Sequence, residues 1–301
     1  MLKAATLPGG IYPPVPTFFT GDEDLDLPIY RQHIRNLAGT GIAGYVVMGS
    51  NGEAVHLSSA ERLQVIEAAR EASDAGALLI AGCGEQATRA TIANCRAARQ
   101  AGADYALVLP PSYFKSRMQE TALLAHYRAI ADASPLPVVI YNMPASAAGL
   151  DLSAAIICAL ADHPNIVAVK DSAGDMAKLA QIVAQVPPDF AVFAGSAGYL
   201  LPALAVGARG AVAALANILP RQVCQVQELF ERGQLVEARE LQSRLAPANT
   251  AVTSTWSVPG LKAALEITAG YGGRPRSPLQ PLGTSERKRL AELLAIASHP
   301  L

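Results

Sequence analysis

Eight short apolar segments recur along the first 220 residues of the chain, and longer amphipathic segments separate them. Most of the short segments are apolar on both faces, which is typical of strands in a parallel sheet that helices cover. The predicted strands are Ile11–Thr17, Ala43–Gly49, Leu78–Gly82, Tyr105–Pro110, Pro137–Tyr141, Ile166–Lys170, Phe190–Ala194 and Gly210–Ala214. The segments between them have helical spacing. Ser58 and Glu61, for example, occupy the two positions of a helix capping box.

Eight strand–helix units in about 220 residues fit a closed (β/α)8 barrel better than an open doubly wound sheet. The predicted fold class is therefore α/β, a TIM barrel over residues 1–220. From Arg221 onwards the strand pattern stops, and four segments with helical spacing follow: Gln222–Gly233, Gln234–Leu245, Pro259–Ala269 and Ser285–Ala297. We expect residues 221–301 to form a C-terminal helical extension packed on the barrel.

The composition excludes several classes of protein. Lys and Arg total 24 against 25 Asp and Glu, so the chain lacks the basic surface of a nucleic-acid binder. Its four cysteines include no CxxC pair, which favours a reducing compartment. The N-terminus reaches Pro8 and Gly9 too early for a signal peptide, and Pro202 interrupts the uncharged segment 190–208. We expect a cytoplasmic protein that binds neither nucleic acid nor membranes.

The carboxyl ends of the predicted strands are where a barrel of this kind places its active site. Lys170 ends an apolar strand on which strict alternation puts it on one face with Ile166 and Ala168. A lone lysine at such a position can simply extend to solvent. Alternatively, it can form a Schiff base, for which the amine must be neutral and its pKa must fall from about 10.4 to about 7–8. Burial favours that change, because it disfavours the ammonium form.

Two further strand ends carry groups that suit such a lysine. Tyr141 ends the preceding predicted strand, and a phenol can both give and take a proton while a carbinolamine forms and collapses. In the segment 49–53, Gly49 and Gly52 flank Ser50 and Asn51, and successive N–H groups in such a turn can bind a carboxylate. Each feature also has an ordinary interpretation, as a rim tyrosine or a glycine turn.

Signals for metals and nucleotides are weak. The segment 82–87 resembles a dinucleotide-binding fingerprint, but the acidic residue Asp104 opens the next strand instead of closing it. The five histidines show no HxxxH or HExxH spacing. We therefore expect no cofactor and no metal site.

Three motifs, taken together, resemble those of the dihydrodipicolinate synthase / N-acetylneuraminate lyase family of class I, pyruvate-dependent (β/α)8 aldolases. They are Gly49-Ser50-Asn51-Gly52-Glu53, Tyr141-Asn142-x-Pro144 and Lys170-Asp171-Ser172. Each motif alone is of modest specificity, but all three in this order, over essentially the whole chain, make a strong signal. The resemblance favours the catalytic interpretation of each strand end over the ordinary one.

The resemblance implies roles for four residues. Lys170 would form an imine with the ketone carbon of pyruvate or of a 2-oxo acid, and Tyr141 would shuttle protons. Ser50 would link Tyr141 to Tyr113, a residue that in the family reaches in from a neighbouring subunit. No metal or nucleotide takes part in this chemistry, because the protonated imine itself accepts the electrons of the broken carbon–carbon bond.

The resemblance also implies a binding site and an assembly. Ser50 and Asn51 would hold the carboxylate of pyruvate, and three residues match wall positions of the site: Ser172, Gly195 and Val212. The expected partners are pyruvate, or another 2-oxo acid, and an aldehyde. Members of the family associate, so we expect a homotetramer arranged as a dimer of dimers.

Within the family the sequence is most similar to the 4-hydroxy-2-oxoglutarate aldolases, which cleave their substrate to pyruvate and glyoxylate. The likeness extends to Ile11–Val15, Ala194–Gly198, Ala214–Asn217 and Tyr271–Gly273. Segment 145–149 lacks the arginine with which dihydrodipicolinate synthases bind a second carboxylate. Three alternatives stay open: a synthase that condenses pyruvate with aspartate semialdehyde, a sugar-acid lyase or dehydratase, and a barrel paralogue without catalytic activity.

Overall fold

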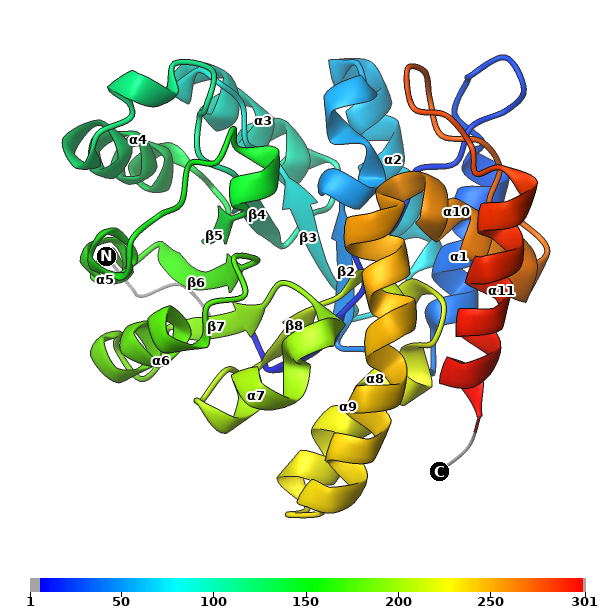
Figure 1. Cartoon of the computed structure of the whole chain (residues 1–301). Helices are drawn as coiled ribbons and strands as arrows, with labels where there is room; N and C mark the ends of the chain where they lie inside the picture. The colour runs from blue at the N-terminus through cyan, green and yellow to red at the C-terminus, as the bar shows by residue number, and fades with distance from the viewer. Residues whose placement is uncertain (1–5, 300–301) are drawn as a thin grey trace.

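The computed structural model describes residues 6–299, and its eight parallel strands form a barrel with helices around it (Figure 1). The strands are β1 (Gly10–Tyr12), β2 (Gly44–Val47), β3 (Leu78–Gly82), β4 (Tyr105–Val108), β5 (Val138–Asn142), β6 (Ile166–Asp171), β7 (Ala191–Ala194) and β8 (Gly210–Val212). The helices that follow them are α1 (Leu27–Leu37), α2 (Ser59–Ala72), α3 (Thr88–Gln100), α4 (Glu120–Ala133), α5 (Ala154–Ala161), α6 (Met176–Gln185), α7 (Leu200–Ala205) and α8 (Pro220–Glu231). The predicted TIM barrel is confirmed, as is the Ser58–Glu61 capping box at the start of α2.

The barrel closes where its first strand meets the second and the last. β1 pairs with β8 through Gly10 and Gly210, and the N–H of Val46 in β2 donates to the carbonyl of Pro13 over 3.0 Å. The predicted first strand, Ile11–Thr17, was too long, because β1 ends at Tyr12. Two prolines follow Tyr12, and a proline has no N–H with which to continue a ladder.

Apolar side chains fill two separate cores. One lies between the strands and the surrounding helices, and the other lies in the lumen. In the lumen Tyr12 and Phe193 meet edge to face with ring centroids 5.7 Å apart, and Val139, Tyr141 and Val212 belong to the same cluster. The lumen is therefore a packed interior, as in other barrels of this size.

Strand β6 contains a bulge that changes which side chains face the lumen. Val138 of β5 pairs with Ile166, but Val139 pairs with Ala168, so β6 carries one extra residue at this point. Ile166 packs in the outer core, whereas Ala168 lies in the lumen cluster. The prediction that Ile166 shares a face with Lys170 is wrong, because strict alternation fails at a bulge. From Ala168 the alternation resumes, and it brings Lys170 to the lumen side.

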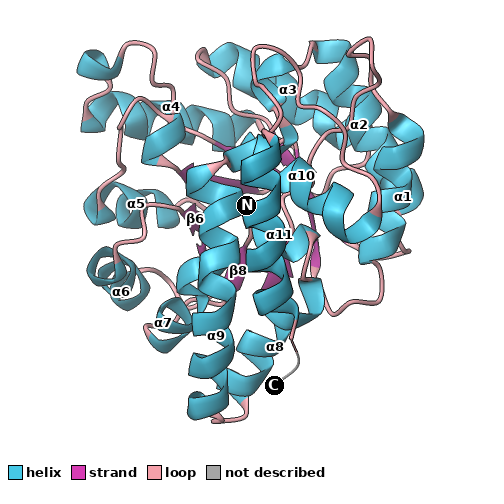
Figure 2. Ribbon diagram, turned by 45° about the vertical axis from the view of Figure 1, so that its right-hand side comes forward, coloured by secondary structure: helices cyan, strands magenta, loops and turns pink. Residues whose placement is uncertain are grey.

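Three further helices follow the barrel, α9 (Leu235–Thr250), α10 (Ser257–Ala269) and α11 (Thr284–Ser298), and they lie against one side of it (Figure 2). The predicted helix end at Leu245 was too early, since α9 continues through Pro247 into a π-helical turn over Ala251–Thr255. The division of the chain at residue 220 stays a prediction, and α8, which begins there, takes the place of the eighth barrel helix. Among residues 6–299, no helix combines the length and apolar character needed to cross a membrane.

Replacing Gly210 by Ala should destabilise the barrel at its closure. A Cβ atom at this position would lie 2.0 Å from the carbonyl oxygen of Gly10, and the residue has a φ of +147°. We expect a loss of about 1–3 kcal/mol in the free energy of unfolding, measured by urea denaturation. The control is Gly21→Ala, at which the added Cβ meets nothing within 4 Å. Equal stability of the two variants would contradict the expectation.

Candidate active site

Tyr141 and Lys170 lie side by side at the carboxyl ends of neighbouring strands. They are direct partners in the register of β5 and β6, so both side chains leave the sheet on the same face. Lys170 is 3 % exposed, and its Nζ atom lies 3.8 Å from the centroid of the Tyr141 ring. A cation at that distance is attracted by the face of the ring. The pair thus places an amine and a phenol together within the lumen.

The electrostatics of this pair act on the phenol. Burial alone would raise the pKa of Tyr141, but the charge of Lys170 lowers it, as do hydrogen bonds with Ser50, Lys170 and Ser172. The net shift is downward. A phenol whose pKa is lowered gives up its proton more readily, which suits a group that must both donate and accept one.

The turn after β2 brings Ser50 to the same phenol. Its Oγ atom lies 3.4 Å from the Tyr141 hydroxyl, a long hydrogen bond of the kind often seen in sites without substrate. Asn51 is the next residue of the same 3₁₀ turn, and its Nδ2 atom is buried without a hydrogen-bond partner among the described residues. A buried donor without a partner is costly, so it points to a ligand that would accept from it.

The residues predicted as walls fall into two groups. Ser172 and Gly195 touch, since a Cβ atom added to Gly195 would lie 1.8 Å from the Ser172 hydroxyl oxygen. That hydroxyl is buried and makes no well-aligned hydrogen bond within residues 6–299. Val212 lies apart from them, on β8, as a buried member of the lumen cluster. Ser172 therefore offers a buried hydroxyl near the Tyr141 phenol, while Val212 offers apolar surface.

A polar network holds the outer side of β5 and β6. The Asn142 amide donates to Asp171 over 2.8 Å and to Asp151 over 2.7 Å, and Lys178 pairs with both carboxylates at 3.0 Å and 2.6 Å. Asp171 is fully buried. Asn142 and Asp171 directly follow Tyr141 and Lys170 on their strands, so their side chains point to the opposite face. A fixed polar network on that face therefore supports the reactive pair on the other. The sequence pointed to Asn142 and Asp171 as motif residues without giving them this role.

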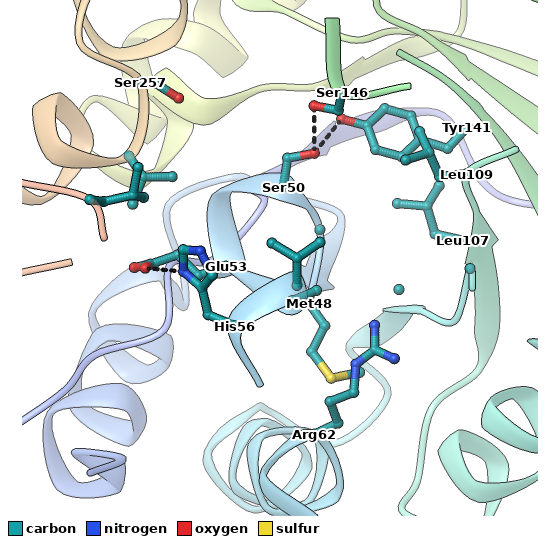
Figure 3. Close-up of a pocket in the computed structure, with 17 residues that line it drawn as sticks. Met48, Ser50, Glu53, His56, Arg62, Leu107, Leu109, Tyr141, Ser146 and Ser257 are labelled. Carbon is teal, nitrogen blue, oxygen red and sulfur yellow. Dashed lines mark hydrogen bonds and ion pairs between the residues drawn. The ribbon is translucent and has the colours of Figure 1, made fainter. Parts of the chain in front are cut away.

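A cavity of about 410 Å³ reaches Tyr141 of this pair (Figure 3). Its lining includes Ser50, Tyr141 and the apolar side chains of Leu107 and Leu109. It also includes Ser146, whose Oγ atom lies 3.5 Å from that of Ser50. No sequence pattern pointed to Ser146, which lies in segment 145–149, where the synthase arginine is absent.

Tyr113 does not join this cluster within a single chain. It lies on the loop after β4 with 80 % of its surface exposed, edge to face with Phe114, and within the described residues it has no hydrogen bond to Ser50 or Tyr141. The N–H of Tyr113 donates to the side-chain oxygen of Gln86 over 2.9 Å, which anchors the loop. The role predicted for Tyr113 requires a second subunit and stays a prediction.

No group of three or more His, Cys, Asp or Glu side chains in the described part of the chain is arranged to hold a metal ion. The ionisable residues that line the cavity, Glu53, His56 and Arg62, are engaged with one another or with neighbours: His56 lies 3.2 Å from Glu53, and Arg62 lies 2.6 Å from Glu85.

One protein-family model matches nearly the whole chain. Residues 7–297 match the model of the dihydrodipicolinate synthetase family. The chain belongs to this family. Membership makes it an enzyme of the class I aldolase type, in agreement with the three motifs in the sequence.

Two similar proteins are named as aldolases that act on different substrates. A probable mitochondrial 4-hydroxy-2-oxoglutarate aldolase of Emericella nidulans is 45 % identical over 94 % of this chain and 93 % of its own length. An L-threo-3-deoxy-hexylosonate aldolase of Hypocrea jecorina is 39 % identical over 92 % of each chain. YagE of E. coli K12, a protein of the same family solved in complex with pyruvate, superposes with a TM-score of 0.90 at 30 % identity, over 96 % of this chain and 98 % of its own. The chain is thus an aldolase of this family. Its cytoplasmic location stays a prediction.

Replacing Lys170 by Met should raise the pKa of Tyr141, because the lysine charge and hydrogen bond oppose the effect of burial. Alkaline difference spectra would follow the phenolate in the wild type and in the variant. Subtracting the spectra of the matching Tyr141→Phe proteins would isolate this tyrosine from the other eight. We expect the phenolate to appear at lower pH in the wild type. Superimposable titrations would show that the two groups do not interact.

Proposed function

We propose that the protein is a Schiff-base lyase that cleaves 4-hydroxy-2-oxoglutarate to pyruvate and glyoxylate, with Lys170 as the nucleophile. The observation that carries this proposal is the position of Lys170, buried in the lumen against the ring of Tyr141. An amine held there is removed from bulk water and has a proton-transfer group in contact, and the cavity reaches that group. A lysine with a purely structural role needs none of these features.

In the proposed reaction the neutral amine of Lys170 attacks C2 of the 2-oxo acid to give a carbinolamine. Tyr141 transfers protons as the carbinolamine loses water and becomes a protonated imine. A base then removes the proton of the C4 hydroxyl, the C3–C4 bond breaks, and its electrons pass to the imine nitrogen to give an enamine and free glyoxylate. The enamine takes a proton at C3, and water releases pyruvate and the free amine. Tyr141, in contact with Ser50, serves as the base.

The groups around the pair suit the carboxylate on the pyruvate half. The buried Asn51 amide makes no hydrogen bond within the described residues, the Ser172 hydroxyl follows two residues after Lys170, and Ser50 begins the turn that carries Asn51. A carboxylate would satisfy these donors at once. Gly195 leaves the space that the Ser172 hydroxyl occupies, and Val212 closes the apolar side.

Fewer residues are assigned to the half of the substrate that leaves as the aldehyde. Ser146 occupies the cavity wall beside Ser50, within the segment where the family's synthases carry an arginine. A hydroxyl there favours a small aldehyde such as glyoxylate over aspartate semialdehyde. The relative named L-threo-3-deoxy-hexylosonate aldolase supports a second candidate, cleavage of a sugar-derived 2-oxo acid.

We also propose that two subunits share each site. Tyr113 and Phe114 form an exposed aromatic pair, and Val55, on the turn after Glu53, is 92 % exposed. Large apolar side chains at such exposure are typical of a surface that another chain covers. In the proposed dimer Tyr113 enters the partner's site and reaches Ser50 there, and two dimers form the tetramer.

Sodium borohydride should trap pyruvate on Lys170. Reduction of the imine makes the link permanent, so the intact protein should gain the mass of one reduced pyruvate adduct per chain. Peptide mapping should place the adduct at Lys170, and Lys170→Ala should abolish it. The control is Lys288→Ala, which removes an exposed lysine of α11 and should leave trapping intact. A folded wild type that gains no adduct would favour the paralogue without catalytic activity.

The aldehyde can be identified by the reverse reaction. Pyruvate would be incubated with glyoxylate, with aspartate semialdehyde and with a sugar-derived aldehyde, and the products would be followed by chromatography. We expect the highest kcat/KM with glyoxylate. A preference for aspartate semialdehyde would identify a synthase, and a preference for the sugar aldehyde would identify the second candidate.

A further inference from the structure

Glu53 closes the turn that carries Ser50 and Asn51, and its backbone is strained. It has a φ of 51° and a ψ of 35°, in the left-handed region that residues other than glycine rarely adopt. Its N–H donates to the carbonyl of Ser50 over 3.1 Å, so its conformation and that of the turn are linked. Such strain persists only where the surroundings fix it.

The surroundings that fix Glu53 come from the far end of the chain. Its side chain is 1 % exposed, and its carboxylate lies 2.7 Å from the Nζ atom of Lys262, which belongs to α10. The N–H of Arg276 donates to the other carboxylate oxygen over 3.0 Å. His56 lies 3.2 Å from that same oxygen. The residue that closes the turn is therefore held mainly by the segment after the barrel.

Lys262 is itself held in a closed environment. It is fully buried, its Nζ atom lies 4.4 Å from the centroid of the Phe19 ring, and it donates to the carbonyl of Arg274 over 3.0 Å. A buried ammonium ion would be very costly without these partners. Its Nζ atom is engaged by the Glu53 carboxylate and by the carbonyl of Arg274, so Lys262 is not a second candidate for the imine. Through its ion pair with Glu53, Lys262 links α10 to the turn.

On the opposite side the turn is held by the segment after β1. The Thr17 hydroxyl, on the segment after β1, donates to the carbonyl of Gly52 over 2.7 Å. The Thr17 bond fixes one peptide group, but it leaves the direction of Glu53 undetermined. The contact with α10 therefore fixes the Glu53 end of the turn, two residues after Asn51.

We propose that the buried Lys262–Glu53 ion pair sets the position of the carboxylate-binding turn, so that α10 is a working part of the substrate site. Glu53 and Lys262 are positioning residues, since neither contacts the reacting atoms. The inference rests on the proposed function, in which Ser50 and Asn51 hold the carboxylate of the 2-oxo acid. Loss of the pair would let the backbone at Glu53 relax and would turn the donors away from the carboxylate.

The experiment is the double substitution Glu53→Gln with Lys262→Met, which removes both charges and leaves neither partner buried alone. The concentration of pyruvate that gives half-maximal borohydride trapping would be measured for the variant and the wild type. We expect it to rise about 10- to 100-fold, since small displacements of binding groups cost this much, with trapping at saturation little changed. Methyl pyruvate, which lacks the carboxylate charge, should be trapped equally by both proteins.

The matched control removes another ion pair of the same helix. Glu266 of α10 pairs with Arg287 of α11, away from the turn, so Glu266→Gln with Arg287→Met should lower the melting temperature without changing half-saturation by pyruvate. A folded Glu53/Lys262 variant that binds pyruvate as the wild type does would overturn the inference. If that variant does not fold, Glu53→Asp decides, because it keeps the charge but withdraws the carboxylate, and unchanged half-saturation would overturn the inference equally. Absence of trapping in the wild type would instead reject the proposed function.

Discussion

The pairing of β5 with β6 in one register is the constraint on which the site depends. Tyr141 and Lys170 are opposite one another in that register, so the amine meets the face of the phenol ring and not bulk water. A polar group in an apolar lumen is costly unless a partner compensates for it, and the face and the hydroxyl of the Tyr141 phenol provide that compensation. A shift of one residue between the strands would separate the two groups, because alternate side chains point to opposite faces.

The rest of the structure maintains this pairing from two directions. On the outer face, Asn142 and Asp171 are the next residues of the same strands, and their hydrogen bonds and the Lys178 ion pairs tie the strand ends together. On the lumen side, the rings of Tyr12 and Phe193 and the aliphatic side chains below them fill the space beneath the site. The reactive pair is thus supported from behind by polar contacts and from below by dense packing.

Much of this could be predicted from the sequence, because both main signals are local. The number and spacing of apolar segments predicted the barrel, and the residues at the strand ends predicted that Lys170 and Tyr141 would meet. What failed depends on details that a single strand does not encode. The length of β1 is set by Pro13 and Pro14, and the direction of Ile166 by a bulge that is defined only relative to β5. Contacts such as that between Glu53 and Lys262 join residues more than 200 positions apart, and no periodicity signals them.

The bulge also limits what a motif can tell about other members of the family. With Ile166 turned outwards, an unbroken two-residue repeat would also turn Lys170 outwards, and the extra residue in β6 reverses that outcome. A protein could keep the motif letters intact and yet lose its nucleophile to the helix side through a single deletion earlier in the strand. To judge whether a homologous sequence encodes a working aldolase, one must therefore check that the number of residues in this strand directs the lysine to the lumen. Finding the lysine in its motif is not sufficient.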